Sequence, residues 1–177
     1  INYPEVINEK TVAVVNIGAN ITNLVIIEKG TPHLFRDLSM GGFYFAENLA
    51  KDMGISFEDA EKLLKGLPVA DVSQEQLEAS LVTNIDNLLE EIEKTFSFYE
   101  AGEKEERKIE QIFLSGGLSK LKDLPLFFEK KFNRKTEIFN PFRKIHYDEK
   151  KFDPLYSQEL AALFCVATGL ATRKVEK

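Results

Sequence analysis

The sequence predicts an α/β fold in which helices flank a mixed β-sheet and a small all-helical lobe is inserted into the sheet domain. Three strand-like runs open the chain of 177 residues, and two more alternate with helical segments after residue 103. Between these two parts, apolar residues recur only at helical spacing. We therefore expect residues 1–54 and 103–177 to form the sheet lobe and residues 55–102 to form the inserted helical lobe.

The three N-terminal strands are expected at residues 11–17, 22–28 and 33–38. Valine, alanine and isoleucine fill the first of them, as in a buried strand. Lys29 and Gly30 supply the tight turn before the third strand. The pattern predicts an antiparallel meander that lies beside a fourth strand at residues 109–114.

Two helices follow the meander. The first comes after Gly41-Gly42 and ends at Gly54. Ser56 is the expected N-cap of the second, with Asp59 in the capping-box position, and Pro68 closes it.

A long helix is expected from Ser73 to about Tyr99, because apolar residues alternate there by three and four. We expect one side of this helix to pack on the neighbouring helix of the inserted lobe and the chain to enter the main domain near Phe96. That side consists of Leu81, Ile85, Leu88 and Ile92.

The last third of the chain alternates strands and helices again. Asp123 and Pro125 begin a helix, and a short strand follows at residues 135–139. The final helix is expected to begin at Asp153-Pro154. Apolar residues on nearly every side of it predict a buried element.

Composition excludes several classes of function. The net charge is −6, and basic residues are scattered among acidic ones, so no basic stripe predicts a nucleic-acid partner. The longest apolar run is too short for a transmembrane segment, and no signal peptide is found. Cys165 is the one cysteine, expected in the core, and His33 and His146 stand apart, so neither a disulfide nor a metal cluster is expected. The chain begins at Ile1, and we expect it to be a fragment of a longer protein.

Two loops of small residues follow apolar strands and predict a nucleotide site. Gly18 lies in the first, at residues 16–22, and Ser115-Gly116-Gly117 forms the second. Glycine lets backbone N–H groups approach a phosphate closely. The first loop taken alone is more typical of an ordinary hairpin turn than of a phosphate site. If both loops meet one nucleotide, they must open on the same edge of the sheet.

The order of these elements resembles the second half of the actin-like ATPases, whose fold is ribonuclease H-like. Several motifs, taken in order, more specifically resemble the PilM family of type IV pilus assembly proteins, over essentially all 177 residues. They are Arg36-Asp37-Leu38-Ser39-Met40-Gly41-Gly42, Glu58-Asp59-Ala60-Glu61, Phe98-Tyr99, Asn140-Pro141-Phe142 and Thr168-Gly169-Leu170-Ala171-Thr172-Arg173.

The resemblance implies a cytoplasmic protein at the inner membrane face of a bacterium with pili for twitching motility. It implies two lobes that bind ATP with Mg²⁺ between them and a partner in the cytoplasmic tail of PilN, with other pilus platform proteins. This chain corresponds to the second lobe, so the first phosphate loop and most of the PilN surface lie elsewhere. ATP hydrolysis is expected to be weak at most in the full-length protein and absent from this chain.

The resemblance also implies which residues would contact the nucleotide. The β- and γ-phosphates would face Gly18, Ala19, Asn20 and Thr22. The ribose and adenine would lie against Ser115, Gly116, Gly117 and Ser119, with Glu61 approaching from the inserted lobe.

Two positions depart from the motifs of the superfamily. Asn16 stands where an aspartate usually holds the water shell of Mg²⁺, and an amide brings no charge to a hard cation. Leu64 stands where a lysine is expected, and Lys65 is about 100° further around the helix. Both departures favour an alternative, a scaffold of the same fold without nucleotide turnover. A second alternative is the related FtsA-type division protein or the type II secretion platform protein, which Asn140-Pro141-Phe142 and the helical lobe argue against.

Overall fold

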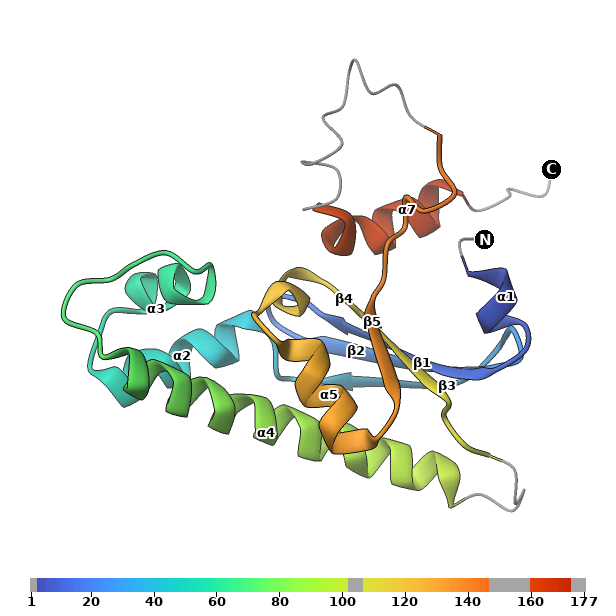
Figure 1. Cartoon of the computed structure of the whole chain (residues 1–177), viewed down its shortest axis with the longest axis horizontal. Helices are drawn as coiled ribbons and strands as arrows, with labels where there is room; N and C mark the ends of the chain where they lie inside the picture. Colours follow the sequence, from blue (N-terminus) through green and yellow to red (C-terminus); the bar gives the residue numbers. More distant parts are fainter. Residues whose placement is uncertain (1–2, 102–106, 147–159, 173–177) are drawn as a thin grey trace.

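The computed structural model describes residues 3–101, 107–146 and 160–172, and it contains the mixed sheet that the sequence predicts (Figure 1). The sheet has five strands in the order β3-β2-β1-β4-β5. In chain order they are β1 (Thr11–Ile17), β2 (Thr22–Glu28), β3 (Thr31–Leu38), β4 (Gln111–Ser115) and β5 (Lys135–Ile138).

The N-terminal meander is confirmed. β1 pairs antiparallel with β2, and β2 pairs antiparallel with β3. Lys29 and Gly30 both have positive φ in the turn, so β3 begins at Thr31, two residues earlier than expected. β1 and β5 each run parallel to β4, which makes the sheet mixed. The parallel pairing sends β1 and β4 to the same edge, where the loops at Gly18 and Gly116 both open, as expected.

Sequence signals explain the ends of the helices after the meander. α2 (Gly42–Met53) ends at Gly54, which is left-handed. Ser56 accepts a hydrogen bond from the Asp59 amide and so caps α3 (Phe57–Leu64). α3 stops before Pro68 because Gly66 already has a φ of 74°.

Two further helices complete this side of the sheet. α4 (Gln74–Glu100) follows the cap residue Ser73, and α5 (Leu124–Phe132) has Pro125 in its first turn. Figure 1 shows α4 running along the sheet, with α2 at its beginning and α5 beside it. Arg36 ties β3 to α4, because its guanidinium donates to Thr95 and pairs with Glu91.

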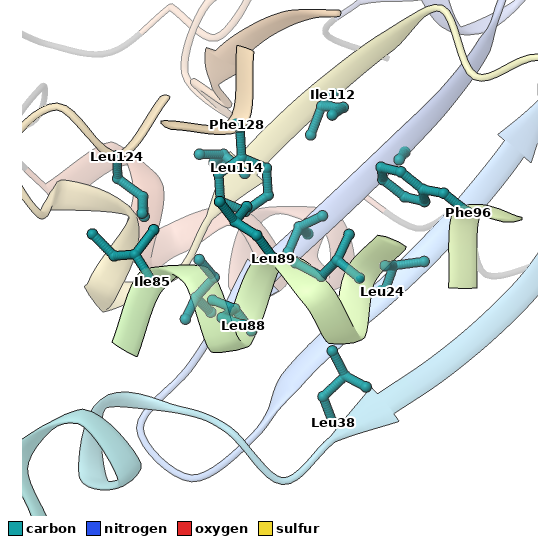
Figure 2. Packing of buried hydrophobic residues seen from close by; sticks show 14 of the residues in the cluster. Leu24, Leu38, Ile85, Leu88, Leu89, Phe96, Ile112, Leu114, Leu124 and Phe128 are labelled. Carbon is teal, nitrogen blue, oxygen red and sulfur yellow. The ribbon is translucent and has the colours of Figure 1, made fainter. Parts of the chain in front are cut away.

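The packing of α4 corrects the expectation from the sequence. Ile85, Leu88 and Ile92 belong to the main core between the sheet, α4 and α5, rather than to a contact with the helix of an inserted lobe. Figure 2 shows Ile85 and Leu88 of α4 in one cluster with Leu24 of the sheet and Phe128 of α5. The reason is length, because a 27-residue helix extends well past the helical lobe and reaches the sheet.

The helical lobe has a small core of its own. Its buried residues are Ala46, Leu49, Ala60, Leu63 and Leu77, from α2, α3 and the first turns of α4. Leu81 packs at its margin. The division of the chain at residues 55 and 102 remains a prediction, and α2 and α4 contribute to both cores.

The opposite face of the sheet is covered by α1 (Pro4–Ile7), whose neighbour Tyr3 packs on Val12 and Phe113. The C-terminal helical segment consists of η2 (Ala161–Phe164) and α7 (Cys165–Ala171). The expectation that this helix is buried is wrong, because α7 contains no buried residue and Val166 and Leu170 are mostly exposed. The expected start at Asp153-Pro154 lies outside the described residues.

Candidate functional site

The candidate site lies at the edge where β1 and β4 end. Asn16 and Ser115 are partners in the parallel register, so the two glycine loops leave the sheet next to each other. Backbone at the ends of adjacent parallel strands is where open α/β sheets bind their ligands. The site is therefore made by the topology of the sheet and by two turns.

The first loop, residues 18–21, is held by α2. The amides of Gly42 and Phe43 donate to the carbonyls of Gly18 and Ala19. A Cβ on Gly41 would lie 2.6 Å from the Ala19 oxygen, so only glycine permits this approach. The carbonyls of the loop thus face α2.

Amides of the first loop remain available to a ligand. The Gly18 amide is used within the loop, where it donates to the Ile21 carbonyl. Ala19 and Asn20 are exposed, and within the described part of the chain their amides donate to no other group. The loop therefore offers backbone N–H donors for an anion on exposed residues, among them Ala19 and Asn20.

The second loop is packed more tightly than the sequence suggests. Gly116 has a φ of 86°, and a Cβ there would lie 2.3 Å from the Ile17 carbonyl oxygen. Its amide donates to Ala162, and its carbonyl accepts from the Ser119 hydroxyl at 2.7 Å. Ser115, Gly116 and Ser119 are all buried, so these residues shape the turn and present no side chain to a ligand.

Gly117 is the exposed residue of this turn. Its amide begins η1 (Gly117–Lys120) and has no acceptor among the described residues. A Cβ at this position would make an ordinary contact with Leu163 at 3.4 Å. Gly117 therefore adds a further N–H donor on an exposed residue at the same edge.

Thr22, the predicted hydroxyl contact to the phosphates, is the first residue of β2. Its side chain is fully buried, and its hydroxyl donates to the Met40 carbonyl at 2.6 Å. This bond fixes the segment that leads from β3 into α2. In this structure, Thr22 supports the first loop from behind.

A groove of about 1170 Å³ begins at Gly117 and separates η1 from the helical lobe. Leu64, Leu81 and Phe127 give it largely apolar walls. Lys65, Lys120 and Lys122 also line it. The first loop and Glu61 do not border this groove, so the structure joins Gly117 to the groove but leaves the other predicted contacts outside it.

Glu61 lies on α3 and is half-buried. Its carboxylate is 4.0 Å from the Lys65 ammonium, one helical turn away. Lys65, which sequence reasoning set aside because it is one position late, does line the groove. Of these two residues, Lys65 has the more direct place at the candidate site.

The end of the sheet carries a row of polar side chains on one face. The Ser115 hydroxyl donates to Asn16 at 3.1 Å, the Asn16 amide donates to Asn23 at 3.2 Å, and the Asn23 amide donates to Asp37 at 2.7 Å. Sequence reasoning missed Asn23 and Asp37. Counting outward from the loop at residues 18–21 would have paired Asn23 with Asn16.

The donor set suits a hydrated cation better than a directly bound one. In the part of the chain that the structure describes, no group of three or more His, Cys, Asp or Glu side chains is placed to hold a metal ion. The side-chain oxygen beside the loops that is not fully buried is the neutral one of Asn16. Mg²⁺ keeps several waters in protein sites, and neutral oxygens can accept hydrogen bonds from them.

Cys165 lies next to the site but is not a nucleophile. Burial raises the pKa of its thiol to about 11, and a hydrogen bond with Ser115 opposes this only in part. The uncharged thiol is therefore the form present at neutral pH. The expectation of a core cysteine is modified, because its side chain is only partly buried.

The chain is similar to known proteins both in sequence and in structure. The family model described as "Type IV pilus assembly protein PilM" matches residues 2–175. The solved structure of the "PilM-PilN type IV pilus biogenesis complex" superposes with a TM-score of 0.81 at 26% identity, covering 96% of this chain and 47% of that one.

Two structures of lower identity show the same fold. The ethanolamine utilization protein EutJ from Carboxydothermus hydrogenoformans has a TM-score of 0.64 at 19% identity, with 92% of this chain and 48% of that chain covered. MreB5 of Spiroplasma citri bound to ADP has a TM-score of 0.66 at 18% identity, with 92% and 52% covered. The actin-like fold is therefore confirmed, and the chain spans about half the length of the structures it matches. Among the described residues, no helix has both the length and the apolar character needed to cross a membrane.

Proposed function

The chain belongs to the PilM family of type IV pilus assembly proteins, and on that premise we propose that it forms half of an ATP-binding site in the pilus assembly platform. The main observation that supports this proposal is the parallel pairing of β1 with β4. It places three exposed residues, Ala19, Asn20 and Gly117, at one edge of the sheet, and their amides have no acceptor among the described residues. A triphosphate is a ligand that such donors recognise.

The proposed nucleotide lies along this edge with its phosphates at the first loop and its base toward Gly117. Mg²⁺ would meet Asn16 through its bound waters and would supply positive charge between the phosphates. The buried Ser115, Gly116 and Ser119 hold the turn, and Thr22 holds the loop. Glu61 stays a proposed contact to the sugar, and the MreB5 structure bound to ADP supports a nucleotide ligand for this fold.

We also propose partners and a location for the longer protein. The solved complex of PilM with PilN supports the PilN cytoplasmic tail as the main partner, with other platform proteins beside it. Through these partners the protein would be held in the cytoplasm at the inner membrane face. Its use there would be to report nucleotide binding to the machine that drives twitching motility.

A second candidate function is a scaffold that does not turn ATP over. Asn16 favours it, because the amide places no negative charge beside the cation. Phosphate release by the longer protein separates the two functions. An ATPase releases phosphate at a rate that falls when the edge is blocked, whereas a scaffold releases none and still binds.

The binding proposal is tested by filling the edge of the site in the longer protein. Gly117→Val puts a branched side chain beside the free amide, whereas Gly169→Val is a matched control, because a Cβ at Gly169 would meet nothing within 4 Å outside its own helix. We expect calorimetry to show MgATP binding in the wild type and the control and at least a tenfold loss in Gly117→Val. Equal binding by all three proteins, with equal melting temperatures, would place the nucleotide elsewhere.

A further inference from the structure

The hydrogen bonds that link the row of polar side chains at the end of the sheet are each defined by a donor and an acceptor. The row crosses four strands in register, from Ser115 on β4 through Asn16 and Asn23 to Asp37 on β3. Ser115 is buried, the two asparagines are half-buried, and Asp37 is exposed. Each member bonds to the next, so the orientation of one side chain constrains its neighbour.

Asp37 sets the direction of these hydrogen bonds because a carboxylate can only accept hydrogen bonds. An asparagine has a donor end and an acceptor end and fits either way round. With Asp37 at one end, Asn23 must turn its NH₂ toward β3 and its oxygen toward Asn16. Asn16 must then turn its own NH₂ toward Asn23 and its oxygen toward β4.

We propose that Asp37 is a positioning residue, which acts through Asn23 to hold the Asn16 amide with its oxygen toward the β4 edge. This inference rests on the proposed function for its consequence at the nucleotide. A carbonyl oxygen at this edge accepts a hydrogen bond from water on a divalent cation, whereas an NH₂ group there would bind a phosphate oxygen instead. The row thus selects the hydrated cation as the group that Asn16 meets.

The proposal predicts that the row is stable with one carboxylate and that a second carboxylate destabilises the native state. In Asn16→Asp, carboxylates flank Asn23 on both sides, and its single NH₂ cannot face both of them. In the double variant Asn16→Asp with Asp37→Asn, the two hydrogen bonds of Asn23 reverse, while the Ser115 hydroxyl still donates to residue 16. Asn23 then donates to residue 16 and accepts from residue 37.

The first experiment is a double-mutant cycle in this chain, followed by urea unfolding and by the side-chain amide NMR signals of Asn16 and Asn23. We expect Asn16→Asp to raise the equilibrium constant for unfolding about tenfold, and the added Asp37→Asn to bring it back to within about twofold of the wild-type value. The asparagine amide signals should move in Asp37→Asn. Additive losses, or unmoved amide signals, would overturn the proposal.

The second experiment concerns the cation and uses the longer protein. The ratio of ATP affinities with and without Mg²⁺ should fall severalfold in Asp37→Asn, and it should stay unchanged in the control Asp86→Asn, an exposed carboxylate on α4. An unchanged ratio in Asp37→Asn would overturn the assignment to the cation. Failure of the wild type to bind ATP would instead remove the proposed function, and the unfolding cycle would still decide the orientation of Asn16.

Discussion

Individual residues at the candidate site divide into those that shape the loops and those that face a ligand. Ser119 and Thr22 are buried, and their hydroxyls donate hydrogen bonds to the backbone carbonyls of Gly116 and Met40. The exposed donors are main-chain amides, which carry no side-chain signal in the sequence. Sequence motifs therefore located the two loops correctly, but they could not say which atoms within the loops remain free.

Cys165 provides a test at the residue scale through pH. Its folded pKa of about 11 lies above the ordinary 9.0, so the thiol of the unfolded chain ionises first. The unfolded state then binds fewer protons than the native state, and the free energy of unfolding falls as pH rises from about 9 to 11. Urea unfolding across this range should show a shallower fall in Cys165→Ala. Parallel curves for the two proteins would mean that the thiol is not buried as the structure has it.

Gly41 tests how the first loop is held by α2. A Cβ on Gly41 meets backbone atoms of Ala19 and Asn20 at 2.6–2.7 Å, whereas a Cβ on Gly42 has 3.8 Å of space. We expect Gly41→Ala to cost about 1–3 kcal/mol of unfolding free energy, because backbone must move. The neighbouring Gly42→Ala should change it by about 0.5 kcal/mol or less. Similar melting temperatures for the two variants would argue against the close contact.

At the scale of elements, the meander could be predicted in position but not fully in register. The loop at residues 18–21 fixes the pairing of Asn16 with Asn23 by counting. Counting outward from the turn at residues 29–30 would place Arg36 opposite Asn23. A register shift between Ile26 and Ile27 places Asp37 opposite Asn23 instead. No feature of the sequence predicts that irregularity.

Ile85 tests the corrected position of α4. It is almost fully buried in the main core, and Figure 2 places it near Leu124. Ile85→Ala should lower the unfolding free energy by about 2–5 kcal/mol, because it removes buried methyl groups and leaves a cavity. Val82→Ala, on the exposed side of the same helix, should change it by about 0.5 kcal/mol or less. Equal melting temperatures would show that the side of α4 bearing Ile85 is not in the core.

Across the whole molecule, the order of strands and helices was the best predictor of the fold. It gave the actin-like class that the solved structures confirm, because each short connection restricts which elements can be neighbours. Burial of the last helix was predicted wrongly from its composition. Apolar side chains such as Val166 and Leu170 favour burial, but the sequence of the helix does not tell which element would cover them, and both are exposed here.

The central claim is that the paired ends of β1 and β4 bind the phosphates and base of one nucleotide. Because the chain spans about half of its structural relatives, we expect it to bind MgATP weakly by itself, without saturable heat at micromolar concentrations and without hydrolysis. Amide NMR during a titration to millimolar MgATP detects such weak contacts residue by residue. The account predicts that the shift changes concentrate at Ala19, Asn20 and Gly117. Changes confined to α5 and β5, or none at these three amides, would contradict it.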